Sequence, residues 1–194
     1  MNIVVAACKN RGIGLKNKLP WTLSKEMKYF KELTIGEKNN AVIMGKNTWL
    51  SIPEKNIPLP KRENIVLTSR VENMFFSCAE NEGINFAPSL ESINVMYGMY
   101  TFDNIWIIGG ERVYNDSLTN VLVDSIFYTE ILSEYECDTF FPEIPDNFTN
   151  IYESKIIYDC NEEIKFKVYK RDGSNISNNK LKRMCIRAEK KALS

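Results

Sequence analysis

The chain has 194 residues, which suits one domain, and its 44% hydrophobic and 26% charged residues are typical of a globular protein with a substantial core. Because 25 Lys and Arg residues balance 25 Asp and Glu residues, the composition argues against a general surface for nucleic acid or anionic membrane. The absence of histidine excludes Ser/His/Asp and Cys/His triads, histidine-ligated metals and imidazole acid–base chemistry. Proton chemistry would therefore use a carboxylate, Tyr, Lys or water, and we expect no metal.

The five cysteines are scattered without any C-x-x-C spacing; they are Cys8, Cys78, Cys137, Cys160 and Cys185. We expect reduced thiols in an intracellular protein. The longest apolar runs are far shorter than a membrane span, and the first of them, Ile3–Cys8, lacks the basic lead of a signal peptide. The sequence thus predicts a cytoplasmic protein with no membrane partner.

Short apolar runs typical of strands buried on both faces alternate with helical patterns along the chain. In chain order we expect a strand at Ile3–Cys8, a loop at Asn10–Trp21, a helix at Leu23–Leu33, a strand at Ala41–Met44, a short helix from Gly45 that ends before Pro53, a strand at Asn64–Thr68, a helix from Leu90 to about Tyr97 capped by Ser89, a strand at Ile105–Ile108, a helix at Glu111–Leu118 and a strand at Ser125–Ile131. The alternating segments Ile151–Tyr158 and Lys165–Lys170 fit an antiparallel hairpin at the sheet edge. The pattern predicts an α/β fold with a mostly parallel sheet and a central first strand.

The last part of the chain, Asp172–Ser194, differs in composition from the rest. It opens with the linker-like stretch DGSNISNN and continues as a strongly basic segment. We therefore divide the chain into a domain at residues 1–171 and a basic tail or linker at residues 172–194. For the tail we expect a disordered or weakly helical extension; the alternative is a docking helix for another domain.

Glu26 interrupts the apolar face of the helix at Leu23–Leu33. At about 100° per residue, Leu23, Met27, Phe30 and Leu33 share one face, and Glu26 falls between Phe30 and Leu33. Burial of a carboxylate is costly and raises its pKa toward values useful for proton chemistry. A structural alternative is that a Glu near a helix start simply interacts with the positive end of the helix dipole.

Ligands of such sheets bind where the parallel strands end. These ends carry glycines and cations in Lys9-Asn10, Gly45-Lys46, Ser69-Arg70 and Gly109-Gly110. Two familiar motifs fail, because the spacing around Gly45 does not fit a P-loop and Asn17 replaces the third glycine of a dinucleotide fingerprint. Helix starts after Gly45 and Gly110 can still hold a pyrophosphate, and Ser69 with Arg70 suits a phosphate monoester. Together these features predict a site for a dinucleotide that carries an extra phosphate.

Several motifs, in the right order, resemble the dihydrofolate reductase family over roughly Ile3 to Arg171. They are Leu19-Pro20-Trp21, Glu26 with Tyr29-Phe30, Val42 to Trp49, Ser51-Ile52-Pro53, Ile107 to Gly110 with Val113-Tyr114, and Asp138 to Pro142. The resemblance implies a single domain with an eight-stranded, mostly parallel sheet, flanking helices and an antiparallel C-terminal hairpin. It also implies NADPH-dependent reduction of 7,8-dihydrofolate to 5,6,7,8-tetrahydrofolate, in which pterin C6 receives a hydride and N5 a proton, in support of one-carbon metabolism and thymidylate synthesis.

The resemblance assigns the catalytic roles to Glu26, Trp21 and Thr129. Glu26 would hold the pterin amidine edge and promote protonation through water, Thr129 would support this carboxylate, and Trp21 would fix a water nearby. The substrate pocket would be formed by Val4, Val5, Ala6, Leu19, Met27, Phe30, Ile52, Leu59, Ile108 and Arg62, which would bind the substrate's α-carboxylate.

The resemblance also implies an NADPH site, in which Lys46, Ser69 and Arg70 would contact the adenosine 2′-phosphate. Its residues would be Ala6, Ile13, Gly14, Gly45, Lys46, Asn47, Thr48, Thr68, Ser69, Arg70, Ile108, Gly109, Gly110, Glu111, Arg112, Val113 and Tyr114. The Gly109–Gly110 bond would be cis, and the loop from Asn10 to Trp21 would cover the nicotinamide.

Three features depart from the family pattern. Met27 stands where many relatives have Phe, Glu111 lies where pyrophosphate is expected and would have to point to solvent, and the basic tail could begin a junction to thymidylate synthase, fused or associated.

Expected small-molecule partners are dihydrofolate and antifolate-type inhibitors. Rival hypotheses are a pyrimidine reductase of the riboflavin pathway and an inactive NADPH-binding module that uses the tail as a partner helix.

Overall fold

The computed structural model describes residues 1–69, 83–97, 102–120 and 122–194. Its strands are β1 (Asn2–Cys8), β2 (Gly12–Gly14), β3 (Asn40–Gly45), β4 (Glu63–Leu67), β5 (Ile84–Ala87), β6 (Asn104–Ile107), β7 (Ser125–Ile131), β8 (Thr139–Phe140), β9 (Phe148–Glu153), β10 (Ile157–Asp159) and β11 (Glu162–Arg171). Within the described residues, nine strands form the main sheet: eight follow the order β10-β11-β7-β1-β6-β3-β4-β5, and β9 pairs with β11 beside that path. The predicted central position of the first strand is confirmed.

Most neighbouring strands of the main sheet are parallel, which confirms the predicted α/β class. β1 pairs in parallel with β6 and β7, and β3 pairs in parallel with β6 and β4. β11 runs antiparallel to β7. Side chains of β1 alternate between two hydrophobic clusters: Ile3, Val5 and Ala7 belong to one, and Val4 and Cys8 to the other. The sheet therefore has a core on each face.

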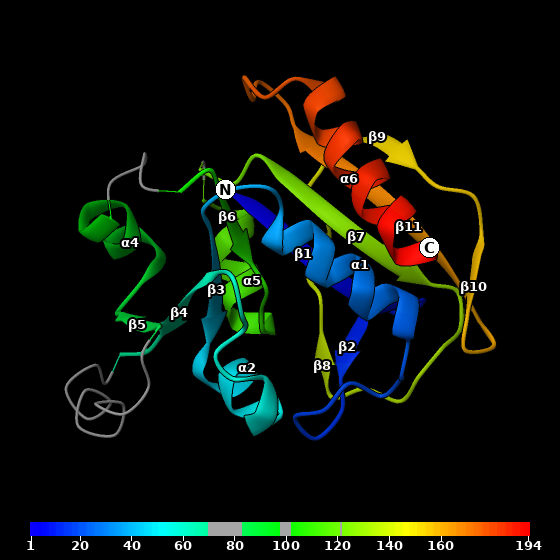
Figure 1. Cartoon of the computed structure of the whole chain (residues 1–194), viewed down its shortest axis with the longest axis horizontal. Coiled ribbons are helices and arrows are strands. Elements are labelled where there is room, and N and C mark those ends of the chain that lie inside the picture. Colours follow the sequence, from blue (N-terminus) through cyan, green and yellow to red (C-terminus); the bar gives the residue numbers. More distant parts are fainter. Residues whose placement is uncertain (70–82, 98–101, 121) are drawn as a thin grey trace.

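Helices cover both faces of the sheet (Figure 1). They are α1 (Ser24–Ile35), α2 (Lys46–Ser51), α4 (Leu90–Tyr97), α5 (Glu111–Leu118) and α6 (Asn178–Leu193), with a 3₁₀ turn at Glu54–Asn56. Buried residues of α1, α2 and α6 share a cluster with Val4, whereas those of α4 and α5 share a cluster with Val5. Of the helices in the described part of the chain, none is both long and apolar enough to cross a membrane.

The C-terminal hairpin is antiparallel, as predicted, but its first arm is divided. β10 and β11 are joined at Cys160 and Asn161, which both have positive φ, the geometry of a two-residue hairpin turn. Preceding them, β9 also pairs with β11. Residues 154–156 separate β9 from β10, and the backbone N–H and the hydroxyl of Ser154 both bond to the backbone of Phe166. The division arises because one long strand, β11, pairs with two short ones in succession.

The expectation of a disordered or weakly helical tail is wrong for residues 178–193, which form helix α6 packed on α1 (Figure 1). Its start is capped by Ser177, whose Oγ accepts a hydrogen bond from the Lys180 N–H at 3.2 Å. Its buried face consists of Leu181, Cys185, Ala188 and Ala192. The helix is stable here because these apolar residues recur at three- and four-residue spacing and meet a partner surface.

The cysteines that the structure describes, Cys8, Cys137, Cys160 and Cys185, are all free thiols, as predicted. Cys78 lies outside the described residues. Burial raises the pKa of the Cys185 thiol to about 12, so this thiol is protonated and contributes to packing.

Candidate active site

Glu26 is buried in the first turn of α1, with 5% of its surface exposed. The hydroxyl of Thr129 on β7 donates to its Oε1 at 3.5 Å, and no Lys or Arg among the described residues forms an ion pair with it. Burial, followed by the nearby negative charge of Asp159, raises the pKa of Glu26 to about 7, although the Thr129 bond acts in the opposite direction. A carboxyl group with this pKa exchanges its proton near neutral pH.

The orientation of α1 differs from the predicted apolar face. Tyr29 is fully buried and stacks on Phe166 at 3.8 Å between ring centroids, whereas Met27 is 49% exposed. The helix is therefore rotated so that Glu26, Tyr29 and Leu33 face inward. Tyr29 was not part of the predicted apolar face. The inward position predicted for Glu26 is nevertheless confirmed.

Most of the predicted pterin pocket lies in one hydrophobic cluster, on the same face of the sheet as α1. Val4, Ala6, Phe30, Ile52, Leu59 and Ile108 all belong to or pack against that cluster, together with Trp21. The side chain of Val5 is buried in the cluster on the opposite face, because adjacent residues of a strand point in opposite directions. Leu19 is 52% exposed and Met27 is 49% exposed, so these two lie outside the buried cluster.

Trp21 is 6% exposed and packs edge to face against Tyr135, with ring centroids 5.4 Å apart. Its indole Nε1 is buried and has no hydrogen-bond partner among the described residues. A buried N–H donor of this kind is costly unless something accepts its hydrogen bond. It therefore fits a polar group of a ligand, or a water that such a ligand holds.

Arg62, which immediately precedes β4, is a second buried charge, and it contacts the C-terminal end of α1. It is 8% exposed, its guanidinium donates to Thr34 Oγ1 and to the Pro60 carbonyl, and it lies 5.9 Å from the centre of the Phe30 ring. No carboxylate in the described part of the chain forms an ion pair with it, and burial lowers its pKa to about 10. Thr34 follows Glu26 by eight residues, so the two anchor points on α1 are about 12 Å apart along the helix. The arrangement suits an elongated ligand with an anionic end.

The turns after β3 and β6 meet each other. The Gly45 N–H donates to the Gly109 carbonyl at 2.7 Å, and a side-chain carbon on Gly110 would lie 3.2 Å from Thr48 Oγ1. Gly109 has a φ of 113°, and a side-chain carbon there would lie 3.0 Å from the Tyr114 ring. The Gly109–Gly110 bond is cis, as the resemblance implied. Because these residues lack side chains, the turns before α2 and α5 can approach each other closely.

The remaining predicted cofactor residues have different environments. Lys46, Asn47 and Ser69 are exposed, Ile13, Thr48 and Thr68 are half-buried, and Gly14 and Val113 are buried. The Arg112 side chain is 94% exposed, and the Tyr114 hydroxyl donates to the Val4 carbonyl at 2.9 Å. Arg70 lies outside the described residues.

Glu111 was expected to point to solvent, and in the structure it makes a surface contact with another element. Its side chain is half-buried, and its Oε2 accepts a hydrogen bond from the Phe140 N–H at 3.2 Å. Phe140 lies on β8, which pairs with β2 in the segment that contains Ile13 and Gly14. Glu111 thus links the start of α5 to the small sheet.

Asp159 is the site residue that sequence reasoning missed. It is 1% exposed and accepts hydrogen bonds from the backbone N–H groups of Ser24, Lys25 and Glu26. Asp159 is 133 residues from Glu26, and no local sequence signal joins the two. The tertiary structure alone reveals the contact.

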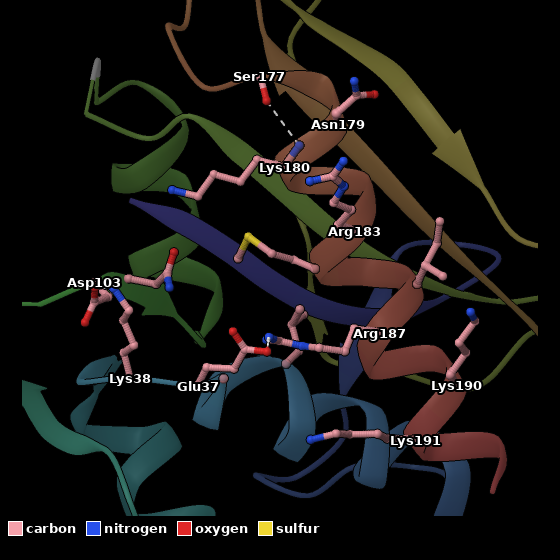
Figure 2. Close-up of a pocket in the computed structure, with 15 residues that line it drawn as sticks. Glu37, Lys38, Asp103, Ser177, Asn179, Lys180, Arg183, Arg187, Lys190 and Lys191 are labelled. Carbon is pink, nitrogen blue, oxygen red and sulfur yellow. Dashed lines mark hydrogen bonds and ion pairs between the residues drawn. The ribbon is translucent and has the colours of Figure 1, made fainter.

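A hollow of about 810 Å³ between the end of α1 and helix α6 contains none of the predicted site residues. Figure 2 shows Arg187 of α6 paired with Glu37, and Lys180 and Arg183 on the same helix. Its lining is formed mainly by charged side chains at the surface. We therefore place the candidate active site on the other side of α1, where Glu26, Trp21 and Arg62 are buried.

The comparisons with known proteins agree with the resemblance found in the sequence. The family described as dihydrofolate reductase matches residues 1–171. The chain is 40% identical to a dihydrofolate reductase of Heliothis virescens over 183 residues, covering 88% of this chain and 97% of that one. It is 41% identical to a dihydrofolate reductase of Gallus gallus over 156 residues, covering 74% and 78%. A bifunctional dihydrofolate reductase-thymidylate synthase of Daucus carota is 39% identical over 151 residues, or 75% of this chain and 28% of that protein.

Proposed function

The chain belongs to the dihydrofolate reductase family, and on that premise we propose that it reduces 7,8-dihydrofolate to 5,6,7,8-tetrahydrofolate with NADPH. The observation that carries the proposal is the buried Glu26 carboxyl, which has a pKa of about 7 and no cationic partner among the described residues. Such a group is costly for stability and is expected where proton chemistry requires it.

Glu26 would bind the amidine edge of the pterin through paired hydrogen bonds. Thr129 supports this orientation through its bond to Oε1. The unpartnered Nε1 of Trp21 would hold the water through which a proton reaches N5. Because the pKa of Glu26 is about 7, the residue can hold a proton at neutral pH and still release it.

The rest of the substrate would lie along α1. Val4, Ala6, Phe30, Ile52, Leu59 and Ile108 would enclose its ring systems. Arg62 would bind the terminal α-carboxylate, which would restore a partner to a buried guanidinium. Leu19 and Met27 would contact the substrate from the exposed side.

The residues at the ends of β3, β4 and β6 fit a dinucleotide. The backbone at Gly109–Gly110 and the start of α2 would hold the pyrophosphate, and Lys46 with Ser69 and Arg70 would contact the 2′-phosphate. The chemistry that NADPH supplies when bound is a hydride for pterin C6. Tyr114, fixed by its bond to the Val4 carbonyl, would help position the nicotinamide end.

Purified protein tests the proposal directly. Adding dihydrofolate to protein and NADPH should cause a loss of NADPH absorbance, and an antifolate-type inhibitor should stop it by competing for the same pocket. A pyrimidine reductase would act instead on a pyrimidine of the riboflavin pathway, and an inactive module would bind NADPH without turnover. Absence of turnover by folded protein that still binds NADPH would reject the proposal.

We extend the proposal to the setting of the reaction. The product would serve one-carbon metabolism and thymidylate synthesis in the cytoplasm. A fused or associated thymidylate synthase stays a prediction, motivated by the carrot relative and by the basic C-terminal segment. Co-purification of thymidylate synthase activity with the protein from its native source would test it.

A further inference from the structure

The first turn of α1 is capped by a residue from a distant strand. Asp159, the last residue of β10, accepts hydrogen bonds from the N–H groups of Ser24 at 3.1 Å, Lys25 at 2.8 Å and Glu26 at 2.9 Å. It also accepts one from the Ser24 hydroxyl at 3.2 Å. Leu23 occupies the N-cap position and makes no capping bond through its side chain. One buried carboxylate therefore satisfies three N–H groups that a helix start leaves unpaired.

Asp159 carries a negative charge that helix capping does not require, and this charge lies close to Glu26. A neutral Ser, Thr or Asn accepts capping bonds about as well as Asp. No Lys or Arg in the described part of the chain forms an ion pair with Asp159. Its negative charge therefore acts on the other carboxyl group of the same turn, where it raises the pKa of Glu26 in addition to the larger effect of burial.

Few other groups in the described part of the chain can tune Glu26. Among those residues, the titratable groups whose charges interact with it are Tyr29 on its own helix, Tyr114 on α5 and Asp159 on β10, while Thr129 on β7 is a neutral hydrogen-bond donor. Burial raises the pKa of both tyrosines, so they are uncharged where Glu26 titrates. Asp159 is the group among these four whose charge acts on Glu26.

We propose that Asp159 is a positioning residue for the reaction. Through its three backbone bonds it fixes the turn that carries Glu26, and through its charge it favours the protonated form of Glu26 near neutral pH. The inference deepens the proposed function, because protonation of the pterin depends on the proton that Glu26 holds. It adds a role for the β10–β11 hairpin, which is otherwise an edge of the sheet.

The decisive variant is Asp159→Asn, which removes the charge but keeps the size and one acceptor oxygen. The first measurement is the titration of the Glu26 carboxyl in ligand-free protein by isotope-edited infrared spectroscopy. We expect its midpoint to fall by roughly half a pH unit to one unit. In the active enzyme, the pH profile of turnover should shift in the same direction, with a smaller effect on the KM for NADPH.

Two control variants separate charge from capping. Ser24→Ala removes the hydroxyl bond to Asp159 but leaves the charge, so it should leave the Glu26 midpoint in place. Glu162→Gln removes a negative charge from the same hairpin, where the carboxylate bonds to Ser133 and Tyr135 instead of α1. It should also leave the midpoint in place.

An unmoved Glu26 midpoint in folded Asp159→Asn would overturn the proposal and leave Asp159 as a helix cap only. If Asp159→Asn does not fold, Asp159→Glu serves as the second variant, since it retains the charge. The Glu26 midpoint should then remain raised, and its fall to an ordinary carboxyl value would overturn the proposal. Because this titration needs no substrate, it decides the role of Asp159 even if the wild-type protein fails to reduce dihydrofolate, an outcome that would reject the proposed function alone.

Discussion

Replacing Glu26 by Gln should make the ligand-free protein more stable at alkaline pH and also inactive. The pKa of Glu26 is raised from 4.5 to about 7. A raised pKa means that the folded protein holds the proton more tightly than the unfolded chain, so the stabilisation is present below pH 4.5 and is lost as pH rises through 7. The full difference corresponds to about 3 kcal/mol. Gln does not titrate, so the variant lacks this loss.

The magnitude can be measured as a difference of differences. Between about pH 5.5 and about pH 8.5, the ionisation of Glu26 should lower the unfolding free energy of the wild type by about 2 kcal/mol. Glu26→Gln should not show this decrease. Urea unfolding of both proteins at the two pH values gives the quantity directly. Glu134→Gln, at an exposed position, provides the matched control. Because it retains Glu26, its stability difference from the wild type should be the same at both pH values. A stability difference between Glu26→Gln and wild type that stays constant with pH within about 0.5 kcal/mol would refute the argument, because Glu26 would then not titrate in this range.

Three further variants test other parts of the molecule. Arg62→Ala should raise the KM for dihydrofolate roughly 10- to 100-fold in steady-state assays while leaving a pteridine without the glutamate nearly unaffected, and equal effects on both would remove Arg62 from the carboxylate site. Leu181→Ala, at a buried position of α6, should lower the unfolding free energy measured in urea by about 2 to 4 kcal/mol. Leu193→Ala, at an exposed position of the same helix, should lower it by well under about 1 kcal/mol. Similar decreases for both variants would mean that α6 does not pack as described. Gly109→Ala should weaken NADPH binding in calorimetry, because its φ of 113° and its contact with the Tyr114 ring exclude a side chain; unchanged affinity would contradict a cofactor site at this turn.

The elements that sequence alone predicted well are those whose signal is local and strong. The bounds of the helix at Glu111–Leu118 and the strand at Ser125–Ile131 agree with α5 and β7. A strand buried on both faces is a continuous apolar run, and it can be recognised without knowledge of its neighbours. The small sheet formed by β2 and β8 was not predicted, because each strand has only two or three residues and depends on the other for its hydrogen bonds.

The same distinction applies to the site. The turn at Gly109–Gly110 was predictable because a positive φ and close approach both require glycine, which is visible in the sequence. The inward position of Glu26 was predictable from helical spacing. Its contact with Thr129 was implied by the family resemblance, but its contact with Asp159 was not, because a strand more than 100 residues away brings Asp159 to it. The rotation that buries Tyr29 and exposes Met27 depends on contacts with Phe166 and Cys185, which local periodicity cannot represent.

The position of α6 gives a structural reason why α1 can hold a buried carboxyl at all. Near pH 7 the ionisation of Glu26 opposes folding, and Asp159 adds to that opposition. Contacts that do not depend on the charge of Glu26 must therefore offset this cost. Tyr29 supplies them: it stacks on Phe166 and lies with its hydroxyl 3.2 Å from the Cys185 thiol of α6. Removing apolar contacts of α6 should thus do more than lower stability at every pH. It should also lower the alkaline pH at which the protein unfolds, because less stability remains to offset the ionisation of Glu26.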